Sequence, residues 1–503
     1  MIQNLGRFRA ELILAAIVAL GAAIYLIATL AMYDHLAFPL DDSWIHLVIA
    51  RNIAQHGEFA YNAGEPTNGS TAPLWTLLLS LGYLFGVEFR VWSYGLGLFF
   101  AWAFGVVLYR LGAAYLIRDR RVALVAAGLA LLEWHVLWCG LAAMETTLFI
   151  FLSLYLLYCH LRGVGALAVG GLGALLVLTR PEGLALLGLV ALDGVVRQRG
   201  WGRRVRYTLA FALPFALLIG PLILYNLGVS GQPLPATFYA KTVEFVDPAG
   251  RTLFGVIGNW LLLVFWSIVL GPQLLLLPGI VYGVTRIIRD LLARTHEARR
   301  RFGLLLLGWW ALLLSAYAFQ LPLMSHHGRY YVPLFPLLIL LGVWGLWELD
   351  KIYRRFRLLK RVYVLLTALA FTVLWLNGAL VYAKDVRLID DEWIPLSTWL
   401  RDHTPPDALV AAHDIGALGY FSQRRIIDMA GLVTPGAIPY IGDQEGMRAY
   451  LAAQGVDYVV TFPLWYPEMI RDPALELVYQ GSSPYLRASF EHNLQVYKAH
   501  WGE

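Results

Sequence analysis

Apolar segments long enough to cross a lipid bilayer recur along the chain from residue 10 to about residue 382. Because a spanning helix needs about 20 predominantly apolar residues, these segments predict membrane-spanning α-helices. The pattern places eleven of them, at residues 10–32, 91–116, 122–139, 145–161, 164–179, 182–196, 207–228, 269–286, 302–320, 331–348 and 361–382. Two further apolar stretches, residues 73–86 and 253–268, are predicted to be helices at the membrane interface. The first of these would reach only about 21 Å as a helix, which is too short for the hydrocarbon core.

The distribution of positive charge orients these helices. Lys and Arg cluster in short segments beside the apolar ones, at Arg7–Arg9, Arg118–Arg121, Arg197–Arg206, Arg286–Arg301 and Lys351–Arg361. Basic loops between apolar spans are cytoplasmic by the positive-inside rule. The N-terminus is therefore predicted to be cytoplasmic and, after eleven spans, the C-terminus extracytoplasmic. A nucleic-acid-binding role for these clusters is disfavoured, because beside apolar spans they ordinarily signal topology.

Two non-membrane regions are predicted on the outer side. Residues 34–90 form a long first outer loop within a transmembrane domain of residues 1–383, whereas residues 384–503 have the composition of a soluble protein. In this last region an amphipathic helix is predicted first, followed by short β-like runs that alternate with a second helix. The helices lie around 393–401 and 447–454, and the β-like runs at 409–413, 425–428, 458–462, 475–479 and 494–499. This alternation predicts a small extracytoplasmic α/β domain.

Composition supports an α-helical polytopic membrane protein and excludes several other classes. Hydrophobic residues make up 59% of the 503 residues and charged residues only 15%, whereas a globular chain carries about 25% charged residues. The two cysteines, Cys139 and Cys159, lie in apolar segments without metal-ligand spacing, so neither a disulfide framework nor a zinc site is predicted. The sequence contains no phosphate-binding Gly-rich loop, dinucleotide fingerprint or metalloprotease motif, which argues against ATP-driven transport and proteolysis.

Ionisable residues near a bilayer are costly, so those outside the basic loops are candidate functional residues. The predicted topology puts them all on the outer side. They are Asp34, Asp41, Asp42, Glu133, Glu145, Arg180, Glu182, Lys241, His326, His327 and Arg329. Although these residues are far apart in the sequence, one shared cavity at the outer face is the simplest interpretation.

The pair Asp41 and Asp42 directly follows the first predicted span. A carboxylate there can accept a proton from an acceptor hydroxyl, or help to bind a divalent cation. The alternative is structural, because either aspartate could be the N-cap of a helix that starts near Trp44. Both interpretations can hold at once, since only one of the two residues is needed as a cap.

The other candidates also have structural alternatives. His326, His327 and Arg329 could bind a phosphate, or could belong to an interfacial belt at a helix end. Lys241 could be a point charge for a phosphate or a side chain that extends toward the interface. Arg180 and Glu182 are interpreted first as an ion pair that orients two helix ends. Asn68 and Ser70 lie in a turn-forming segment just before a proline at a predicted helix start.

Taken in order, six short motifs resemble those of the C-type (GT-C) glycosyltransferases, and most closely the bacterial branch that contains the mycobacterial terminal arabinofuranosyltransferases. The motifs are DDSWI from Asp41, NGSTAPLW from Asn68, METTLF from Met144, LTRPEG from Leu178, LPATFYAK from Leu234 and HGRYYVP from His327. The resemblance extends over the whole chain. It implies a GT-C fold with interfacial helices in the first outer loop and a C-terminal extracytoplasmic domain.

The resemblance also implies an activity and a set of site residues. The expected reaction is an inverting transfer of a sugar from a polyprenyl-phosphate-linked donor to a glycan, lipid or protein acceptor, on the outer face of a bacterial plasma membrane. Asp41 or Asp42 would match the family's general base. Lys241, His326, His327 and Arg329 would match donor-phosphate binding, and Glu145, Arg180, Glu182, Asn68, Ser70 and Tyr239 would position substrates. Membrane lipids are expected partners and nucleic acid is not. No metal ligand is assigned, and a possible divalent cation is the only cofactor considered.

Two other classes of function are weighed against this one. A secondary transporter or flippase would place ionisable residues near the bilayer midplane, often in two related halves. The predicted midplane is nearly free of charge and no inverted repeat is visible, which disfavours that class. An ancillary assembly factor would leave the polar residues at the outer face without an explanation.

Overall fold

The computed structural model describes residues 9–245, 252–320, 325–352, 357–484 and 492–501. The chain divides into two compact units. The first, called the helical unit here, comprises Met1–Ala28, Tyr94–Gly220 and Asp247–Val381. The second, called the sheet unit, comprises Thr29–Ser93, Pro221–Val246 and Tyr382–Glu503. The first loop and residues 221–246 group with the C-terminal region in this division, and the domain boundary at residue 383 stays a prediction.

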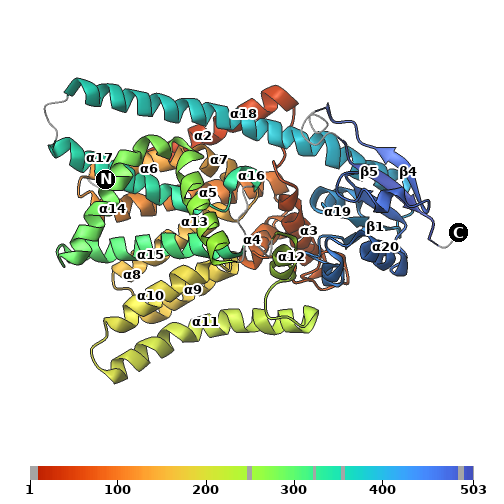
Figure 1. The fold of residues 1–503 in the computed structure, drawn as a ribbon, viewed down its shortest axis with the longest axis horizontal. Coiled ribbons are helices and arrows are strands. Elements are labelled where there is room, and N and C mark those ends of the chain that lie inside the picture. The colour runs from red at the N-terminus through yellow and green to blue at the C-terminus, as the bar shows by residue number, and fades with distance from the viewer. Residues whose placement is uncertain (1–8, 246–251, 321–324, 353–356, 485–491, 502–503) are drawn as a thin grey trace. The chain divides into compact units, whose positions relative to one another are not determined.

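Apolar helices, rich in Leu, Ala and Val, dominate the helical unit. Apolar surroundings offer the backbone no hydrogen-bond partners, and an α-helix satisfies its backbone groups within the segment. The apolar helices that lie wholly or partly in the helical unit are α2 (Arg9–Tyr33), α5 (Phe89–Leu111), α6 (Arg120–Leu131), α7 (Trp134–Gly140), α8 (Thr146–Leu161), α9 (Ala166–Thr179), α10 (Gly183–Val196), α11 (Trp201–Ser230), α13 (Leu253–Val269), α14 (Leu277–Leu292), α15 (Glu297–Gln320), α17 (Phe335–Ile352) and α18 (Arg357–His403). Helices α8, α9 and α10 pack against one another (Figure 1).

Each of the eleven predicted spans falls on helical structure, but the number of spans stays a prediction. Within the described ranges, six helices are long and apolar enough to cross a membrane, or up to eight if each of two bent pairs counts as one span. Helices α8, α9 and α10 contain 16, 14 and 14 residues, fewer than the roughly 20 that a perpendicular span needs.

Two predicted elements are bent where the sequence changes character. The span predicted as continuous over 122–139 breaks between α6 and α7, which meet at 60°. The carboxylate of Glu133 accepts hydrogen bonds from the backbone N–H groups of His135 and Val136, and so begins a new helix there. The second bend, of 90°, separates α13 from the segment that begins at Pro272, where proline cannot continue the preceding helical hydrogen bonds.

The sheet unit contains three helices from the first loop and the 221–246 segment. They are α3 (Asp41–His56), α4 (Pro73–Leu84) and α12 (Ala236–Phe245). Helix α4 corresponds to the short helix predicted at 73–86, and Pro73 occupies its first turn, where the missing N–H has no intrahelical partner to lose. Helices α3 and α4 pack against each other, and α19 (Gly416–Ser422) packs on α3.

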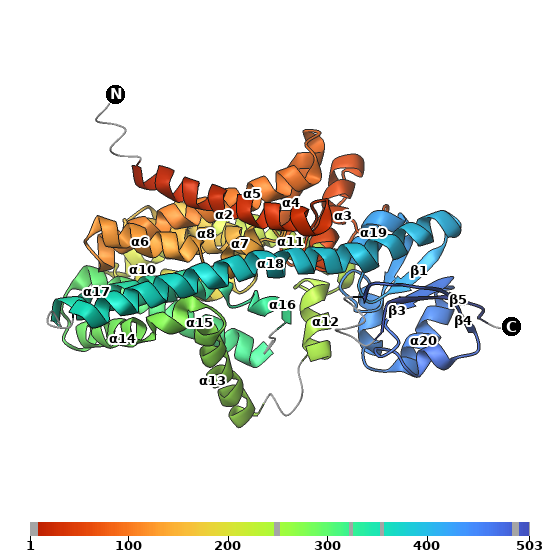
Figure 2. The ribbon, with the colours of Figure 1, turned by 90° about the horizontal axis from the view of Figure 1, so that it is seen from above.

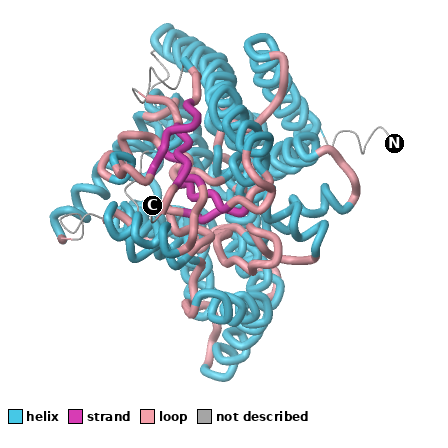
Figure 3. Tube along the Cα trace, turned by 90° about the vertical axis from the view of Figure 1, so that its right-hand side faces the viewer, coloured by secondary structure: helices cyan, strands magenta, loops and turns pink. Residues whose placement is uncertain are grey.

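The C-terminal part of the sheet unit confirms the predicted α/β domain. Its strands, seen together in Figure 3, are β1 (Leu409–Ala412), β2 (Arg425–Asp428), β3 (Tyr458–Thr461), β4 (Leu475–Gln480) and β5 (Gln495–Ala499). Their order is β2-β1-β3-β5-β4, with β1 parallel to β2 and β3, and β5 antiparallel to β3 and β4. Figure 2 shows α19 and α20 (Gln444–Ala453) on opposite sides of the strands. This is the arrangement that right-handed crossovers from β1 to β2 and from β2 to β3 produce.

Two details of this region differ from the prediction. The amphipathic helix expected around 393–401 is the last part of α18, which continues without interruption from Arg357 to His403. No proline occurs between Arg357 and Glu392, so nothing in the sequence forces an earlier end. Helix α19 was not predicted, because its seven residues are too few to show a helical period.

Candidate functional site

The topology of the sheet singles out the carboxyl end of β1. The chain leaves β1 toward β2 on one side and later returns to β3 on the other side. In open parallel sheets, ligands bind outside the carboxyl ends of the strands at such a reversal of strand order. His413 and Asp414 directly follow β1 and therefore lie at this position.

The carboxylate of Asp41 is held at the same place. Its Oδ2 accepts a hydrogen bond from the backbone N–H of Gly416 and its Oδ1 accepts one from Ala417, each at 2.7 Å. These two residues form the first turn of α19, whose own N-cap residue, Ile415, gives no side-chain cap. Asp41 thus caps α19 from a distant part of the sequence. The approach is close enough that a Cβ at position 416 would lie 1.9 Å from the Asp41 carbonyl oxygen, so glycine is required there.

The predicted capping of the helix near Trp44 by Asp41 or Asp42 is wrong in its details. Helix α3 begins at Asp41 itself, and its N-cap residue is Leu40, which makes no side-chain cap hydrogen bond. Both aspartates lie in the first turn of α3, where a negative charge favours the positive end of the helix dipole. Asp41 does cap a helix, but that helix is α19 and not α3.

The surroundings of Asp41 shift its protonation toward neutral pH. Burial, followed by the negative charge of Asp414, raises the pKa of Asp41 to about 8, although the two backbone N–H groups act in the opposite direction. A carboxyl group with such a pKa exchanges its proton near physiological pH, which is what a general base needs.

A charged cluster that the motif analysis missed lies beside Asp41. The Nε2 atom of His413 is 3.4 Å from a carboxylate oxygen of Glu244, and its Nδ1 atom is 3.3 Å from a carboxylate oxygen of Asp414. Burial opposes protonation of His413, yet hydrogen bonds to Asp414 and Glu244 and the charges of both raise its pKa to about 10. The position of His413 in the sequence could have identified it. His413 was predicted to end a strand, and polar residues at the ends of parallel strands are candidate ligand-binding residues.

Helix α12 carries one predicted residue, Lys241, as well as Glu244 of this cluster. Lys241 and Glu244 are three positions apart on α12 and therefore lie on the same helix face. The side chain of Thr237, one turn before Lys241, donates a hydrogen bond to the carbonyl of Gly69. Glu244, which contacts His413, thus connects the face that carries Lys241 with the carboxyl end of β1.

The predicted substrate-positioning residues of the first loop have structural partners. The amide of Asn68 donates a hydrogen bond to the Ser230 hydroxyl at 2.8 Å. The Ser70 hydroxyl lies 3.0 Å from that of Thr76 and accepts a hydrogen bond from the backbone N–H of Ala72. Tyr239 is on α12, where its ring packs edge-on against Phe238.

In the helical unit, Arg180 pairs with Glu145 and lies over the same aromatic ring as Arg329. The Nε of Arg180 donates a hydrogen bond to a carboxylate oxygen of Glu145 at 2.6 Å, and both side chains are buried. The guanidinium groups of Arg180 and Arg329 lie 5.8 Å and 5.1 Å from the centre of the Tyr330 ring. The ion pair of Arg180 is therefore with Glu145 and not, as interpreted from the sequence, with Glu182. Arg180 is the C-cap residue of α9 and has an extended backbone.

The two histidines occupy an unusual backbone turn. His326 and His327 have φ angles of 51° and 56°, and Gly328 follows with 69°. Left-handed conformations at two consecutive non-glycine residues are costly and occur preferentially at functional sites. The ring of His327 lies 5.5 Å from that of Trp134 and 5.4 Å from that of Trp138, so it packs among aromatic side chains.

The twelve predicted site residues thus divide equally between the two units. Asp41, Asp42, Asn68, Ser70, Tyr239 and Lys241 belong to the sheet unit, and Glu145, Arg180, Glu182, His326, His327 and Arg329 to the helical unit. A single shared cavity therefore stays a prediction. The divalent cation stays one as well, since in the described ranges no three His, Cys, Asp or Glu side chains form a metal-binding group.

Comparison with known proteins supports the fold. Residues 379–500 match a family described as a domain of unknown function (DUF8728), and no curated protein matches the sequence. The crystal structure of ArnT from Cupriavidus metallidurans bound to undecaprenyl phosphate is similar with a TM-score of 0.56 and 16% identity, over 96% of this chain and 97% of that one.

Two other solved structures are similar as well. The archaeal oligosaccharyltransferase AglB from Archaeoglobus fulgidus, in complex with an inhibitory peptide and a dolichol-phosphate, gives a TM-score of 0.55 and 14% identity, over 97% of this chain and 74% of that one. The mycobacterial arabinofuranosyltransferase AftD gives a TM-score of 0.47 and 18% identity, over 96% of this chain and 41% of that one. At these identities the likeness concerns the fold. The chain is a polytopic membrane protein with the GT-C glycosyltransferase fold.

Proposed function

We propose that the protein transfers a sugar from a polyprenyl-phosphate-linked donor to a hydroxyl group of a glycan, lipid or protein acceptor. The fold supports this class of reaction, because ArnT and AglB, which share it, were solved with undecaprenyl phosphate and with a dolichol-phosphate. The membrane would be a bacterial plasma membrane. The sheet unit would lie on its outer face and the N-terminus in the cytoplasm, in keeping with the distribution of basic residues.

The observation that carries the proposal is the position of Asp41. Its carboxylate lies at the carboxyl end of β1, is fixed by two backbone N–H groups, and has a pKa of about 8. In the proposed step the acceptor oxygen attacks the anomeric carbon while Asp41, or its neighbour Asp42, takes the hydroxyl proton. The bond from the anomeric carbon to the phosphate oxygen breaks, and polyprenyl phosphate leaves with that electron pair. Attack opposite the leaving group inverts the anomeric configuration.

The basic candidates would stabilise the leaving phosphate. Lys241 in the sheet unit, together with His326, His327 and Arg329 in the helical unit, would provide positive or hydrogen-bonding groups for it. The remaining residues, Glu145, Arg180, Glu182, Asn68, Ser70 and Tyr239, would position the two substrates. Electrostatic stabilisation of a departing phosphate is a large part of the rate in such reactions.

A transfer assay tests this proposal. The purified full-length protein, in lipid nanodiscs, is incubated with a panel of polyprenyl-phosphate sugars and a cell-envelope glycan fraction, and the release of polyprenyl phosphate and the labelled product are measured. We expect transfer by the wild type and a loss of about 10²–10⁴-fold when the general base is removed, as Asp41→Asn or Asp42→Asn. The matched control is Asp443→Asn, because Asp443 is an aspartate that caps α20 in the same unit.

Two results would overturn the proposal. Wild-type turnover in both Asp41→Asn and Asp42→Asn would show that neither carboxylate takes the proton. Movement of the lipid-linked sugar across vesicle membranes, without transfer to any acceptor, would identify a flippase instead.

A further inference from the structure

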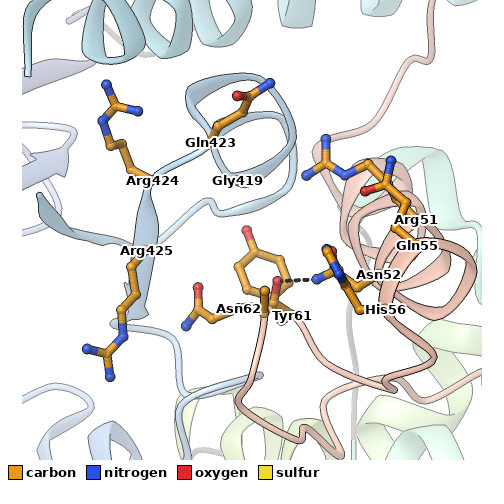
Figure 4. A pocket seen from close by; sticks show the side chains of 11 residues that line it. Arg51, Asn52, Gln55, His56, Tyr61, Asn62, Gly419, Gln423, Arg424 and Arg425 are labelled. Atoms are coloured by element: carbon orange, nitrogen blue, oxygen red, sulfur yellow. Dashed lines mark hydrogen bonds between the residues drawn. The ribbon is translucent and has the colours of Figure 1, made fainter. Parts of the chain in front are cut away.

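A polar cavity lies in the sheet unit, at the end of α3 that is opposite Asp41. It has a volume of about 470 Å³ and is formed by the end of α3, the loop that follows it, and the junction of α19 with β2. Figure 4 shows the Arg51 guanidinium extending from α3 toward the loop that carries Gln423. Arg51 is ten residues after Asp41 on the same helix, which corresponds to about 15 Å along the helix axis. The Arg51 end of the cavity is therefore far from Asp41, whereas Tyr61, which also lines the cavity, donates a hydrogen bond to the Ile415 carbonyl just before α19.

The lining of this cavity is positively charged. Of the eleven residues that line it, three are arginines and one is a histidine, namely Arg51, Arg424, Arg425 and His56, and none is an aspartate or glutamate. Arg425 forms an ion pair with Glu65, so its charge is compensated. The charges of Arg51 and Arg424 therefore decide the character of the cavity.

Both of these arginines have neutral hydrogen-bond partners in the described part of the chain. Arg51 donates to the Tyr420 carbonyl at 3.1 Å and its guanidinium lies 4.6 Å from the centre of the Tyr420 ring. Arg424 donates to the Thr404 hydroxyl and to the carbonyls of Ser422, Arg401 and Thr404. Burial, followed by the charge of Arg401, lowers the pKa of Arg424, and the more weakly acting charges of Asp402 and Asp407, which do not line the cavity, oppose this shift. The positive charge at the cavity thus exceeds the negative charge.

The walls of the cavity are fixed before any ligand arrives. The Asn52 amide donates hydrogen bonds to the carbonyls of Ala60 and Tyr61, each at 2.9 Å. Asn62 bonds both the backbone N–H and the carbonyl of Ile426 on β2. These bonds attach the loop after α3 to α3 itself and to β2. A preorganised wall lowers the entropic cost of binding.

Two glutamines complete the lining. Gln55 and Gln423 are exposed at the cavity, and each amide offers donors and acceptors of the kind that sugar hydroxyls bind. Gln423 ends α19 in a left-handed conformation, with φ 54° and ψ 33°. Strained backbone at a non-glycine residue occurs preferentially at ligand-binding positions.

We propose that this cavity binds an anionic saccharide, meaning a sugar residue that carries a carboxylate or a phosphate. The planar guanidinium of arginine binds either anion through paired hydrogen bonds, while the amides of Gln55 and Gln423 bind hydroxyl groups. The cavity volume lies in the range typical of small-ligand sites, about 300–1,000 Å³. The inference concerns binding, and it stands whether or not the protein catalyses sugar transfer.

The test is calorimetric titration of the full-length protein in nanodiscs with four probes: glucuronate, glucose 1-phosphate, glucose and inorganic phosphate. We expect the two anionic sugars to bind more tightly than either glucose or phosphate alone. Arg51→Gln should weaken their binding by about tenfold or more, because a hydrogen bond to a charged group is lost. Arg448→Gln is the control, since Arg448 is an arginine on α20 that pairs with Asp472 outside the cavity.

Arg51 also packs on the Tyr420 ring, so Arg51→Gln removes a structural contact together with the charge. A second variant changes the charge of the cavity without removing that contact. Gln55→Glu places a negative charge in the cavity at an exposed position, and it should reduce binding of both anionic sugars while leaving the unfolding temperature unchanged. Asp41→Asn should bind them as the wild type does, which separates this inference from the proposed reaction. Glucose binding as tightly as the anionic sugars, phosphate binding as tightly as glucose 1-phosphate, or unchanged binding by both Arg51→Gln and Gln55→Glu would each overturn it.

Discussion

The Oδ2 atom of Asp41 lies 2.7 Å from the backbone nitrogen of Gly416, a residue 375 positions later in the chain. This hydrogen bond and its companion to Ala417 attach the start of α3 to the first turn of α19. The motif after the first span and the domain at the end of the chain therefore build one site. A carboxylate in this position stabilises the fold through the two backbone hydrogen bonds, and in the proposed reaction it would also accept the proton of the acceptor hydroxyl.

Asp41→Asn should lower the stability of the protein more than Asp407→Asn, a matched substitution at an exposed aspartate of the same unit. An amide presents one oxygen and one NH₂ group, so one of the two N–H groups at the start of α19 would face a donor instead of an acceptor. A buried donor without a partner costs about 1–3 kcal/mol. Thermal unfolding of the detergent-purified variants, followed by tryptophan fluorescence, measures the difference. Equal unfolding temperatures for the two variants would contradict the capping of α19 by Asp41.

The cluster at His413 predicts a pH-dependent stability. The pKa of His413 is raised from its ordinary 6.5 to about 10, so the folded protein binds this proton more tightly than the unfolded chain. The stabilisation is complete below about pH 6.5 and is lost as the pH rises toward 10. We expect the unfolding temperature of the wild type to fall between pH 7 and pH 10, and that of His413→Gln to fall less.

Asp41 complicates this comparison in a known direction. Its pKa is also raised, to about 8, so its contribution is lost as the pH rises from about 4 through 8. Both the wild type and His413→Gln contain Asp41, so subtracting their unfolding temperatures at each pH removes the contribution of Asp41. An identical slope for both proteins between pH 8 and pH 10 would show that His413 does not hold its proton there.

Breaking the buried pair of Glu145 and Arg180 should destabilise the helical unit. Each single variant, Glu145→Gln or Arg180→Gln, leaves a buried group without its counter-charge, which costs about 3–5 kcal/mol. The double variant Glu145→Leu, Arg180→Met should recover much of this loss, because no buried charge then remains. Glu348→Gln is the control, since Glu348 pairs with Lys351 in a partly exposed position. Loss of such an exposed ion pair lowers the free energy of unfolding by only about 0–1 kcal/mol. Unfolding temperatures in detergent report all four.

Lys241→Ala and Arg329→Ala should impair use of the donor more than use of the acceptor. Each substitution removes a cation proposed to bind the leaving phosphate, so the KM for the polyprenyl-phosphate sugar should rise or kcat should fall while the KM for the acceptor stays constant. Lys498→Ala, at an exposed position on β5, is the control. If both variants have the donor KM and kcat of the wild type, Lys241 and Arg329 do not bind the leaving phosphate and their role is structural.

Local patterns predicted the elements of this fold well. The apolar runs correspond to helices, and the β-like runs at 409–413 and 458–462 correspond to β1 and β3. Contacts between distant segments were not predictable in the same way. The pairing of Arg180 with Glu145 depends on how α8 and α9 pack, and the capping of α19 by Asp41 joins residues 375 positions apart. A single sequence contains the side chains of such pairs but no signal of their proximity, because tertiary packing brings them together.

Helix α3 has a consequence for the length of an acceptor. It carries Asp41 in its first turn and Arg51 ten residues later, and an α-helix neither stretches nor shortens appreciably at about 1.5 Å per residue. The helix would thus act as a ruler between the proposed reaction centre and the proposed anion site. A saccharide with its negative charge about 15 Å from the reactive hydroxyl would reach both places at once. Shorter chains would contact only one of them, so the protein would select its acceptor by length as well as by charge.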